Sequence, residues 1–484
     1  MSSAGQTPIS FTEQDLALFS QASGDRNPLH LSSEYARSTA YGQPVVFGCL
    51  GALAALGHIH LPAGWSVTSL EAEFLRPMFL SVEYRIETSE KEGKWGARLF
   101  DGSIHTLSVS VTAEISHRTE TPPETVAGPA FEHTESVARR LEEIVPGLKV
   151  AGLYACSPAA LVALAARWGV ADRLLLSLLS FSSYLVGMEI PGESALFSKL
   201  VLRIPATVLP PAALRYQASV VSVNTRLGQI KLDISLLSGP SIVASGQYWS
   251  FVRPPIPEVE EIDSVGVRPD SLAGRACVLL GSSRGLGASI KRALELRGAA
   301  VYGMARSAHA LGQSRTGVGD AADPDALRRL RERVLTEQGR LDFLICNACP
   351  PILPLRLEPS AAGRIAEYIS QAIALTLAPL AEFSDLLNRS EGCVVIISSA
   401  AVDHPVREWP HYIAAKQAVE ALGCIASLQF PRVRTLIVRP PKLLTSLTNT
   451  PMGRLGASSP ALLANRIATR LEDPPEPGRT EILC

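Results

Sequence analysis

The chain has 484 residues, 46% of them apolar and 19% charged, and its 45 basic side chains nearly balance its 46 acidic ones. This composition excludes a disordered chain, and the balanced charge gives no indication of a nucleic-acid partner or a membrane surface. The 8 cysteines are scattered along the chain, which excludes a dense disulfide scaffold and favours a reducing, cytoplasmic setting.

No segment of the sequence predicts export or a membrane span. The first residues lack the basic and apolar regions of a signal peptide. The longest apolar-leaning run, residues 174–188, contains several serines and is shorter than the roughly 18–20 residues that a spanning helix needs. We therefore expect no membrane partner.

Two stretches rich in Pro, Thr or Glu predict linkers, at residues 118–135 and 253–271. They divide the chain into three segments, residues 1–117, 136–252 and 272–484. We expect one domain or structural repeat in each segment.

The first two segments share one plan. Each contains an apolar stretch that predicts a buried helix, residues 44–59 in the first and 158–187 in the second, followed by runs with the alternation of strands. A buried helix wrapped by a curved antiparallel sheet is a hotdog fold, and two such units side by side would cover each other's sheet edges. We therefore expect an α+β double hotdog. The predicted strands are 70–76, 82–87, 105–115, 195–204, 214–222, 230–237 and 241–252.

The first candidate site is a turn that carries Asp25 and His30 on either side of an Asn-Pro pair. Adding water across a C2–C3 double bond, or removing it, needs one group that takes a proton while another returns one. It also needs donors for a thioester oxygen that gains negative charge, and the amides near Gly48, at the start of the first predicted helix, would supply them. A simple helix stop and turn is the alternative interpretation.

A resemblance strengthens the catalytic interpretation. The segment FSQASGDRNPLHLSSEYARSTAYGQPVVFGCL resembles the signature of MaoC-like (R)-specific enoyl hydratases, and AEFLRPMF resembles the strand after the helix in that family. The similarity covers about residues 10–115. It implies that Asp25 and His30 are the catalytic dyad, that Asn27 orders the loop, and that Gly48 lies near the oxyanion site.

Two positions depart from the family pattern. Ser32 stands where an acid is frequent, and Phe47 stands where a histidine commonly precedes the glycine. The second repeat carries no acid–base pair of this kind, because no histidine occurs between His133 and His309. We expect it to complete the sheet and to line an acyl tunnel, an arrangement similar to double-hotdog hydratases with one working half.

The third segment has a different texture. Short, continuously apolar runs alternate with helix-compatible stretches, which predicts an α/β Rossmann-type doubly wound parallel sheet. After the first run, a glycine-rich turn opens a predicted helix, the context required of a turn that binds a dinucleotide phosphate. The turn consists of Gly281, Ser282, Ser283, Arg284, Gly285, Leu286 and Gly287. The predicted strands are 276–280, 301–304, 343–346, 394–397 and 435–438.

The end of the second of these strands indicates which dinucleotide binds. An NAD site usually has an acidic residue there for the ribose hydroxyls. Here Ala305 and Arg306 occupy the position, and a guanidinium at Arg306 or Arg284 would pair with a 2′-phosphate. The sequence therefore favours NADP(H) over NAD.

The third candidate site places a phenol and an ammonium on one helix face, at Tyr412 and Lys416. A nearby cation is expected to lower the pKa of the phenol, which could then exchange a proton with a carbonyl oxygen as hydride is transferred. Ser399, at the end of a strand, could hold the same oxygen. Alone, the Tyr-Lys spacing is also typical of a solvated helix face.

Together these motifs resemble the short-chain dehydrogenase/reductase family across residues 272–450, most closely its 3-oxoacyl-carrier-protein reductases. The resemblance implies catalytic Ser399, Tyr412 and Lys416. It also implies nucleotide contacts from the glycine turn, from Asp320 near the adenine, and from Asn347 and Ala348 after a strand.

Departures from this second family are also visible. The family's Asn-Asn-Ala-Gly reads Cys346-Asn347-Ala348-Cys349 here, and Pro440-Pro441 stands where the family has Pro-Gly. By spacing, Gln371 falls where the family has the helix asparagine that holds a proton-relay water. The two cysteines have CxxC spacing, but no second Cys or His pair supplies further ligands, so we expect no metal site.

The two resemblances imply one reaction sequence: NADPH-dependent reduction of a 3-oxoacyl thioester to the (3R)-hydroxyacyl thioester, then dehydration to the trans-2-enoyl thioester, as in fatty-acid or polyketide-like synthesis. The substrate would be carried on acyl carrier protein or coenzyme A, and a homodimer is expected by resemblance. Two alternatives remain. In one, only the reductase works and the hotdog part is an acyl-binding platform. In the other, the chain is a non-catalytic acyl-carrier docking protein.

Overall fold

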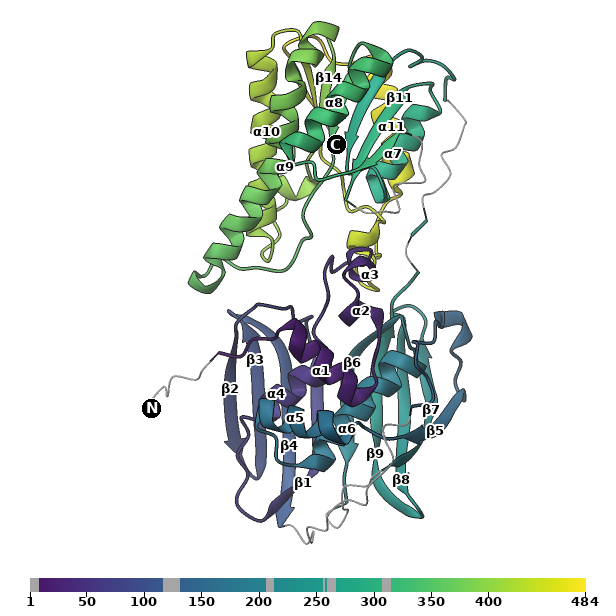
Figure 1. Cartoon of the computed structure of the whole chain (residues 1–484), viewed down its shortest axis with the longest axis vertical. Helices are drawn as coiled ribbons and strands as arrows, with labels where there is room; N and C mark the ends of the chain where they lie inside the picture. Colours follow the sequence, from purple (N-terminus) through teal and green to yellow (C-terminus); the bar gives the residue numbers. More distant parts are fainter. Residues whose placement is uncertain (1–7, 116–130, 206–212, 256, 259–266, 307–314) are drawn as a thin grey trace. The chain divides into compact units, whose positions relative to one another are not determined.

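The computed structural model describes residues 8–115, 131–205, 213–255, 257–258, 267–306 and 315–484. The chain divides into two compact units, one formed by residues 1–255 with 450–452 and the other by the rest. The first two predicted segments therefore belong to one unit. Each unit is described by itself below (Figure 1).

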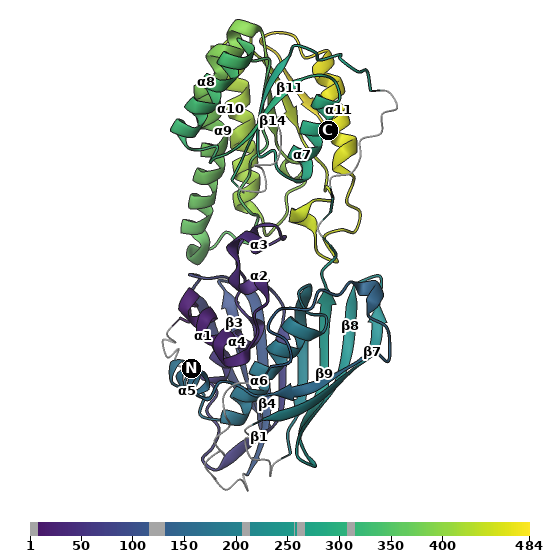
Figure 2. The same cartoon turned by 45° about the vertical axis from the view of Figure 1, so that its right-hand side comes forward.

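The N-terminal unit is built on one antiparallel sheet that wraps a layer of helices (Figure 2). In the described residues its nine strands follow the order β2-β3-β4-β1-β6-β9-β8-β7-β5. The strands are β1 (Trp65–Phe74), β2 (Tyr84–Lys91), β3 (Lys94–Asp101), β4 (Ile104–Ile115), β5 (Lys149–Tyr154), β6 (Ala195–Arg203), β7 (Leu214–Asn224), β8 (Gln229–Ser238) and β9 (Ser241–Val252). The helices are α1 (Glu13–Ser23), α2 (Pro28–Leu31), α3 (Ser33–Arg37), α4 (Gly48–Leu56), α5 (Pro158–Trp168) and α6 (Arg173–Tyr184), which continues as a π-turn, η2 (Leu185–Glu189).

The two halves of this sheet join at strands β1 and β6. These strands pair antiparallel from Ser69 opposite Arg203 to Glu73 opposite Lys199. The Lys199 ammonium donates to the Glu73 carboxylate across the join at 2.9 Å. The join satisfies backbone groups that would otherwise form two open edges, which confirms the expected double hotdog.

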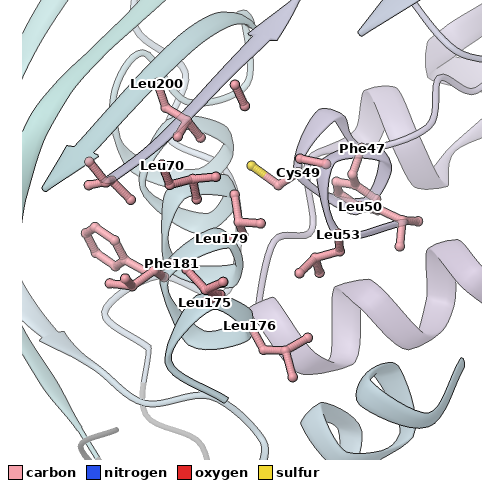
Figure 3. Packing of buried hydrophobic residues seen from close by; sticks show 14 of the residues in the cluster. Phe47, Cys49, Leu50, Leu53, Leu70, Leu175, Leu176, Leu179, Phe181 and Leu200 are labelled. Carbon is pink, nitrogen blue, oxygen red and sulfur yellow. The ribbon is translucent and has the colours of Figure 1, made fainter. Parts of the chain in front are cut away.

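The core of the unit lies where the two central helices meet the joined strands. Helix α4 is apolar on all sides, and every residue after its first is buried. Figure 3 shows Leu50 and Leu53 of α4 close to Leu175 and Leu179 of α6, with Leu70 of β1 beyond them. A helix that is hydrophobic all round belongs in a core, so the sequence places α4 in the interior rather than on a surface.

The two halves repeat one local device before each central helix. Helices α1 and α5 both end at a glycine in the left-handed conformation, Gly24 with φ of 72° and Gly169 with φ of 69°. In the first half, a long excursion through α2 and α3 separates this glycine from α4. In the second half, Asp172 caps α6 almost immediately, through its carboxylate at 2.9 Å from the Leu174 amide. The second half thus lacks the whole segment that carries the predicted dyad.

The C-terminal unit has a parallel sheet with helices on both faces. Its seven strands in the described residues follow the order β12-β11-β10-β13-β14-β15-β16, and all pairings are parallel. Helices α7 and α11 share one buried cluster with the sheet, and α8, α9 and α10 share the other (Figures 1 and 2). The elements are β10 (Ala276–Leu280), α7 (Gly285–Glu295), β11 (Ala300–Ala305), β12 (Thr316–Val318), α8 (Pro324–Gln338), β13 (Phe343–Cys346), α9 (Ala362–Ser390), β14 (Cys393–Ile397), α10 (Pro410–Gln429), β15 (Arg434–Val438), α11 (Pro460–Glu472) and β16 (Thr480–Leu483).

This strand order places a topological switch point between β10 and β13, because the chain leaves β10 toward one edge of the sheet and returns beside it at β13. Ligands of doubly wound sheets bind beyond the carboxyl ends of the strands at such a point. The glycine turn follows β10 and Asn347 follows β13, so the fold brings both predicted nucleotide-binding segments to that position.

Two details differ from the sequence predictions. The predicted linker at 118–135 lies outside the described residues up to 130, but Phe131 already packs on Tyr154 and Tyr184 and so belongs to the core. Helix α4 is shorter than the predicted 44–59.

Within the described ranges, no helix is both long and apolar enough to cross a membrane.

Candidate active sites

The first site is organised around Asp25, whose side chain is buried in the N-terminal unit at 1% exposure. One carboxylate oxygen accepts from the Asn27 amide at 3.0 Å, and the other accepts from the Ser183 hydroxyl at 2.7 Å. Burial raises the pKa of Asp25 to about 7, and the two hydrogen bonds oppose that rise. The carboxyl group therefore exchanges its proton near neutral pH, as a general acid or base requires.

The geometry of His30 defines its tautomer. Its Nδ1 lies 2.6 Å from the Val45 carbonyl oxygen, which can only accept, so Nδ1 must carry the proton. Burial lowers the pKa of His30 to about 4, with the nearby Arg253 guanidinium lowering it further, so the ring is neutral at pH 7. In a neutral ring with a proton on Nδ1, Nε2 has a free lone pair and can act as a base.

Asn27 holds the loop between these two residues. Its side-chain oxygen accepts from the Leu29 amide at 3.0 Å and caps α2. Its side-chain nitrogen donates to the carbonyls of Gly187 at 3.1 Å and Gly192 at 3.2 Å, both in the second half. Asn27 therefore fastens the loop to η2 and to the residues that follow it; the resemblance implied a loop-ordering role for this residue.

The start of α4 is the place predicted for the oxyanion site. The N-cap residue is Phe47, whose side chain makes no capping hydrogen bond, so the first-turn amides from Gly48 onward have no side-chain acceptor there. The Phe47 ring stacks on His30 with centroids 4.0 Å apart. Free amides at the positive end of a buried helix suit a developing negative charge on a thioester oxygen.

The corresponding position in the second half has no acid. Val170 follows the left-handed Gly169 as Asp25 follows Gly24, and Val170 is buried and apolar. The second half therefore has no equivalent of the Asp25 carboxyl at this position. It nevertheless takes part in the first site through Ser183 and Gly187, a contribution that the sequence analysis missed.

The second site is the glycine turn between β10 and α7, and its backbone fits a dinucleotide phosphate. Gly281 and Gly285 have φ of 80° and 52°, a region that glycine adopts without strain. The Asn347 side-chain amide donates to the Gly281 carbonyl at 2.8 Å and fixes the turn. Arg284, the N-cap of α7, makes no side-chain capping bond, so the first-turn amides remain for an anion. Ser282 adds a buried hydroxyl with no hydrogen-bond partner in the described residues.

The remaining predicted nucleotide contacts lie near this turn in the sheet order. Ser283 is half-buried and Leu286 is buried in the same turn, while Ala348 lies against Gly281, 3.0 Å from where a β-carbon would be. Arg306 is exposed directly after β11. Asp320 follows β12, and its carboxylate accepts from the Ala322 amide at 2.9 Å.

Replacing Gly287 by alanine should weaken NADPH binding. An added β-carbon would lie 1.9 Å from the Gly281 carbonyl oxygen and 2.7 Å from the Asn347 amide nitrogen, so the turn must open. Overpacking of this kind costs about 1–3 kcal/mol, or roughly tenfold to a hundredfold in Kd. Fluorescence titration with NADPH measures the change. Gly363→Ala in α9, where a β-carbon meets no atom within 4 Å, is the control and should bind normally. Equal binding by both variants would show that this turn does not hold the nucleotide.

The third site joins Tyr412, Lys416 and Ser399. The Lys416 ammonium is buried, donates to the Ile397 carbonyl at 2.8 Å and lies 5.6 Å from the Tyr412 ring centroid. Burial raises the pKa of Tyr412, while Lys416 and the Ser399 hydroxyl lower it, and burial has the larger effect. The expected net decrease is therefore wrong for the protein alone. The phenol keeps its proton at neutral pH, the form that can donate to a carbonyl oxygen.

Three further side chains surround this site that sequence reasoning did not assign. The Cys349 thiol lies 3.5 Å from the Tyr368 hydroxyl, and both act electrostatically on Tyr412. His411 packs edge-on against the Tyr368 ring with centroids 4.4 Å apart, and neither of its ring nitrogens has a hydrogen-bond partner in the described residues. The only sequence signal was Cys349 as a departure from the family pattern.

The structure does not support the proposed part of Gln371. This residue lies on the exposed side of α9, and its amide donates to Glu367 one turn earlier, at 3.1 Å. The buried side of the helix is formed by residues such as Ala372 and Thr376. Neighbouring residues of a helix face different directions, so a position inferred only from spacing need not lie on the buried side, and the structure places Gln371 on the exposed one.

Cys346 and Cys349 are both free thiols in the structure. Among the described side chains, no group of three or more His, Cys, Asp or Glu is arranged to bind a metal ion.

Comparison with known families agrees with this geometry. The site geometry defines a dehydratase-type hotdog unit and a dinucleotide-dependent oxidoreductase unit in one chain. A model described as MaoC like domain matches residues 2–110, and one described as short chain dehydrogenase matches residues 275–452. The chain therefore carries a MaoC-like domain followed by a short-chain dehydrogenase domain, and the two domains indicate an enzyme.

Several individual proteins are also similar. The fatty acyl-CoA reductase of Acinetobacter baylyi is 25% identical over 202 residues, which cover 36% of this chain and 68% of that protein. The L-xylulose reductase of Bos taurus is 26% identical over 204 residues, covering 39% and 78%. A solved alcohol dehydrogenase from the archaeon Thermococcus sibiricus, complexed with 5-hydroxy-NADP, is 25% identical with a TM-score of 0.39 and covers 43% of this chain and 95% of its own.

Proposed function

We propose that the chain reduces a 3-oxoacyl thioester with NADPH and dehydrates the resulting (3R)-hydroxyacyl thioester to the trans-2-enoyl thioester. The observation that carries the proposal is the pair of proton-handling sites, Asp25 with His30 and Tyr412 with Lys416, because the product of the second is the substrate of the first. Coenzyme A or acyl carrier protein would carry the acyl group, in a homodimer.

The dehydration half follows from the protonation states of the dyad. Neutral His30, with its lone pair on Nε2, accepts the proton from C2 of the substrate. Asp25, with a pKa of about 7, donates its proton to the leaving hydroxyl. Amides at the start of α4, near Gly48, stabilise the charge that develops on the thioester oxygen. The dyad keeps one transferable proton throughout, on Asp25 before dehydration and on His30 after it, and hydration begins from the second arrangement.

The reduction half follows from Tyr412. A bound nicotinamide dinucleotide would supply the hydride. Tyr412 donates its phenolic proton to the C3 carbonyl oxygen, and Ser399 orients that oxygen through its hydroxyl. Lys416 stabilises the phenolate left behind, since its ammonium is held beside the Tyr412 ring by the Ile397 carbonyl.

The preference for NADPH rests on Arg306, which is exposed directly after β11, with Ala305 rather than an acid before it. Arg306→Asp should lower kcat/KM for NADPH by about tenfold to a hundredfold and spare NADH, because a charge-assisted contact to the 2′-phosphate becomes repulsive. Steady-state kinetics with both nucleotides measures this. Arg292→Asp on the exposed side of α7 makes the same charge change away from the turn and should leave the ratio unaltered. An unchanged ratio in Arg306→Asp would assign the selectivity elsewhere.

The decisive experiment incubates the full chain with NADPH and an acetoacetyl thioester, on coenzyme A and on acyl carrier protein in turn, and follows the products by mass. We expect the 3-hydroxybutanoyl thioester first, heavier than the substrate by the two hydrogen atoms gained in reduction. The butenoyl thioester should follow, lighter than that intermediate by one water. Consumption of NADPH without the butenoyl product would leave a reductase on an acyl-binding platform, and no NADPH consumption would overturn the reductase assignment.

A further inference from the structure

The second half of the hotdog unit has no dyad of its own, yet two of its residues contact the carboxyl group of Asp25. The Ser183 hydroxyl of α6 donates to one Asp25 carboxylate oxygen at 2.7 Å, and both groups are buried. Gly187 of η2 lies so close that a β-carbon there would be 2.5 Å from the same oxygen. Two residues from the second half therefore limit where the carboxyl can lie.

The two oxygens of Asp25 have separate restraints. The Asn27 amide, on the same loop, holds Oδ1 at 3.0 Å, whereas Ser183 alone holds Oδ2 from across the unit. Rotation of the carboxyl about its last bond would break both hydrogen bonds. The bond to Ser183 therefore fixes the plane of the carboxyl as well as its position.

We infer that Ser183 is a positioning residue for the dehydratase reaction. We also infer that the absence of a side chain at Gly187 leaves the space that the Asp25 carboxyl requires. The second half then acts in catalysis through the Asp25–Ser183 hydrogen bond, although it has no acid–base pair. This inference rests on the proposed hydratase/dehydratase function and specifies how the two halves share one site.

Other groups around Asp25 cannot take the place of Ser183 in holding the carboxyl. Cys49 of α4 and Tyr154 of β5 both interact electrostatically with Asp25, but burial raises the pKa of each well above its usual value, so both are neutral near pH 7. His30 is neutral there as well. The Ser183 hydroxyl is thus the polar side chain bonded to Oδ2 that favours the ionised carboxyl.

The test compares variants of the full chain in the hydration of trans-2-butenoyl-coenzyme A, followed by the loss of its ultraviolet absorbance. Ser183→Ala should lower kcat about tenfold to a hundredfold, the range expected for a hydrogen bond to a charged group, with little change in KM. Without this donor, the alkaline limb of the pH–rate profile should move to higher pH by about one unit, since the ionised form of Asp25 loses a stabilising bond.

Ser182→Ala is a matched control on the same helix. The Ser182 hydroxyl is equally buried but is paired with the Tyr248 hydroxyl at 2.6 Å, away from Asp25. A purely structural effect would lower the yield of folded protein and its thermal stability in both variants, without moving the pH–rate profile. We expect Ser182→Ala to retain the wild-type profile per folded molecule.

Gly187→Ala tests the position of the Asp25 carboxyl independently, and it provides the test if Ser183→Ala does not fold. Its β-carbon must displace the Asp25 carboxyl, so kcat should fall with KM nearly unchanged. Wild-type kcat and pH profile in a folded Ser183→Ala or Gly187→Ala variant would overturn the inference. A wild-type chain that hydrates no enoyl thioester would instead overturn the proposed function.

Discussion

Replacing Asp25 by asparagine should reduce hydration of a trans-2-enoyl thioester by about 10²- to 10⁴-fold, the usual contribution of a positioned acid–base group. The amide keeps the size of the carboxyl and can still accept a hydrogen bond from Asn27 or Ser183, but it cannot exchange a proton. NADPH-dependent ketone reduction depends on residues of the other unit and should be unchanged. Parallel assays of both reactions on one preparation measure the separation.

The control for Asp25→Asn is Asp15→Asn. Asp15 is also a buried carboxylate of the N-terminal unit, but the Arg167 guanidinium binds it at 2.8 Å and its pKa is lowered. That variant should lose stability and keep its hydration rate per folded molecule. Undiminished hydration in Asp25→Asn would remove Asp25 from the chemistry and leave the hotdog unit as an acyl-binding platform.

The raised pKa of Asp25 also gives this variant a signature in stability. The pKa of this carboxyl rises on folding from its ordinary value of 3.8 to about 7, so the folded state binds the proton more tightly. The stability contributed by the protonated form is present below about pH 4 and is lost as pH rises through about 7. Asp25→Asn should abolish that part of the pH dependence, and wild-type turnover should decline above pH 7 as the acid ionises.

Sequence reasoning could propose the N-terminal dyad because its residues are close in the sequence. Asp25, Asn27 and His30 lie around one turn, and the family resemblance implied the catalytic role that the residue types alone left open. Ser183 was invisible because it is 158 residues from Asp25, and a serine in an apolar helix has no pattern of its own. Only the joining of β1 to β6 brings α6 to the loop.

Local pattern also explains which strands were found. The buried central strands β10 and β13 were predicted with their observed bounds, because continuous apolar runs mark strands covered on both faces. Strands β5 and β16 lie at sheet edges and have mostly exposed or half-buried residues, and neither was predicted. An edge strand is defined by its neighbour more than by its own hydrophobicity.

In the reductase unit, spacing predicted which residues lie side by side but not their electrostatics. The i, i+4 relation correctly placed Lys416 beside Tyr412. It could not show that the fold partly withdraws the phenol from water, an effect on its pKa that exceeds that of the cation. Burial depends on the whole fold, so the sign of a pKa shift is not readable from a motif.

Replacing Tyr412 by phenylalanine should lower NADPH-dependent reduction of an acetoacetyl thioester by about 10²- to 10⁴-fold. The ring keeps its edge-on packing against Trp409, with centroids 6.0 Å apart, and only the proton donor is lost. Lys416 and the glycine turn are untouched, so the Kd for NADPH should stay within about twofold of wild type, a change well below 1.4 kcal/mol. Nucleotide oxidation at 340 nm and fluorescence titration provide the two measurements.

Tyr302→Phe separates loss of chemistry from loss of a buried hydroxyl. The Tyr302 hydroxyl of β11 donates to the Glu337 carboxylate of α8 at 2.9 Å and not to a residue of the third site, so its removal should leave reduction at the wild-type rate. Enoyl hydration should persist in Tyr412→Phe, since its proton donors lie in the other unit. Reduction that survives the loss of the Tyr412 hydroxyl would mean that another acid supplies the proton, and Tyr368, the phenol 3.5 Å from Cys349, would then be the first side chain to replace.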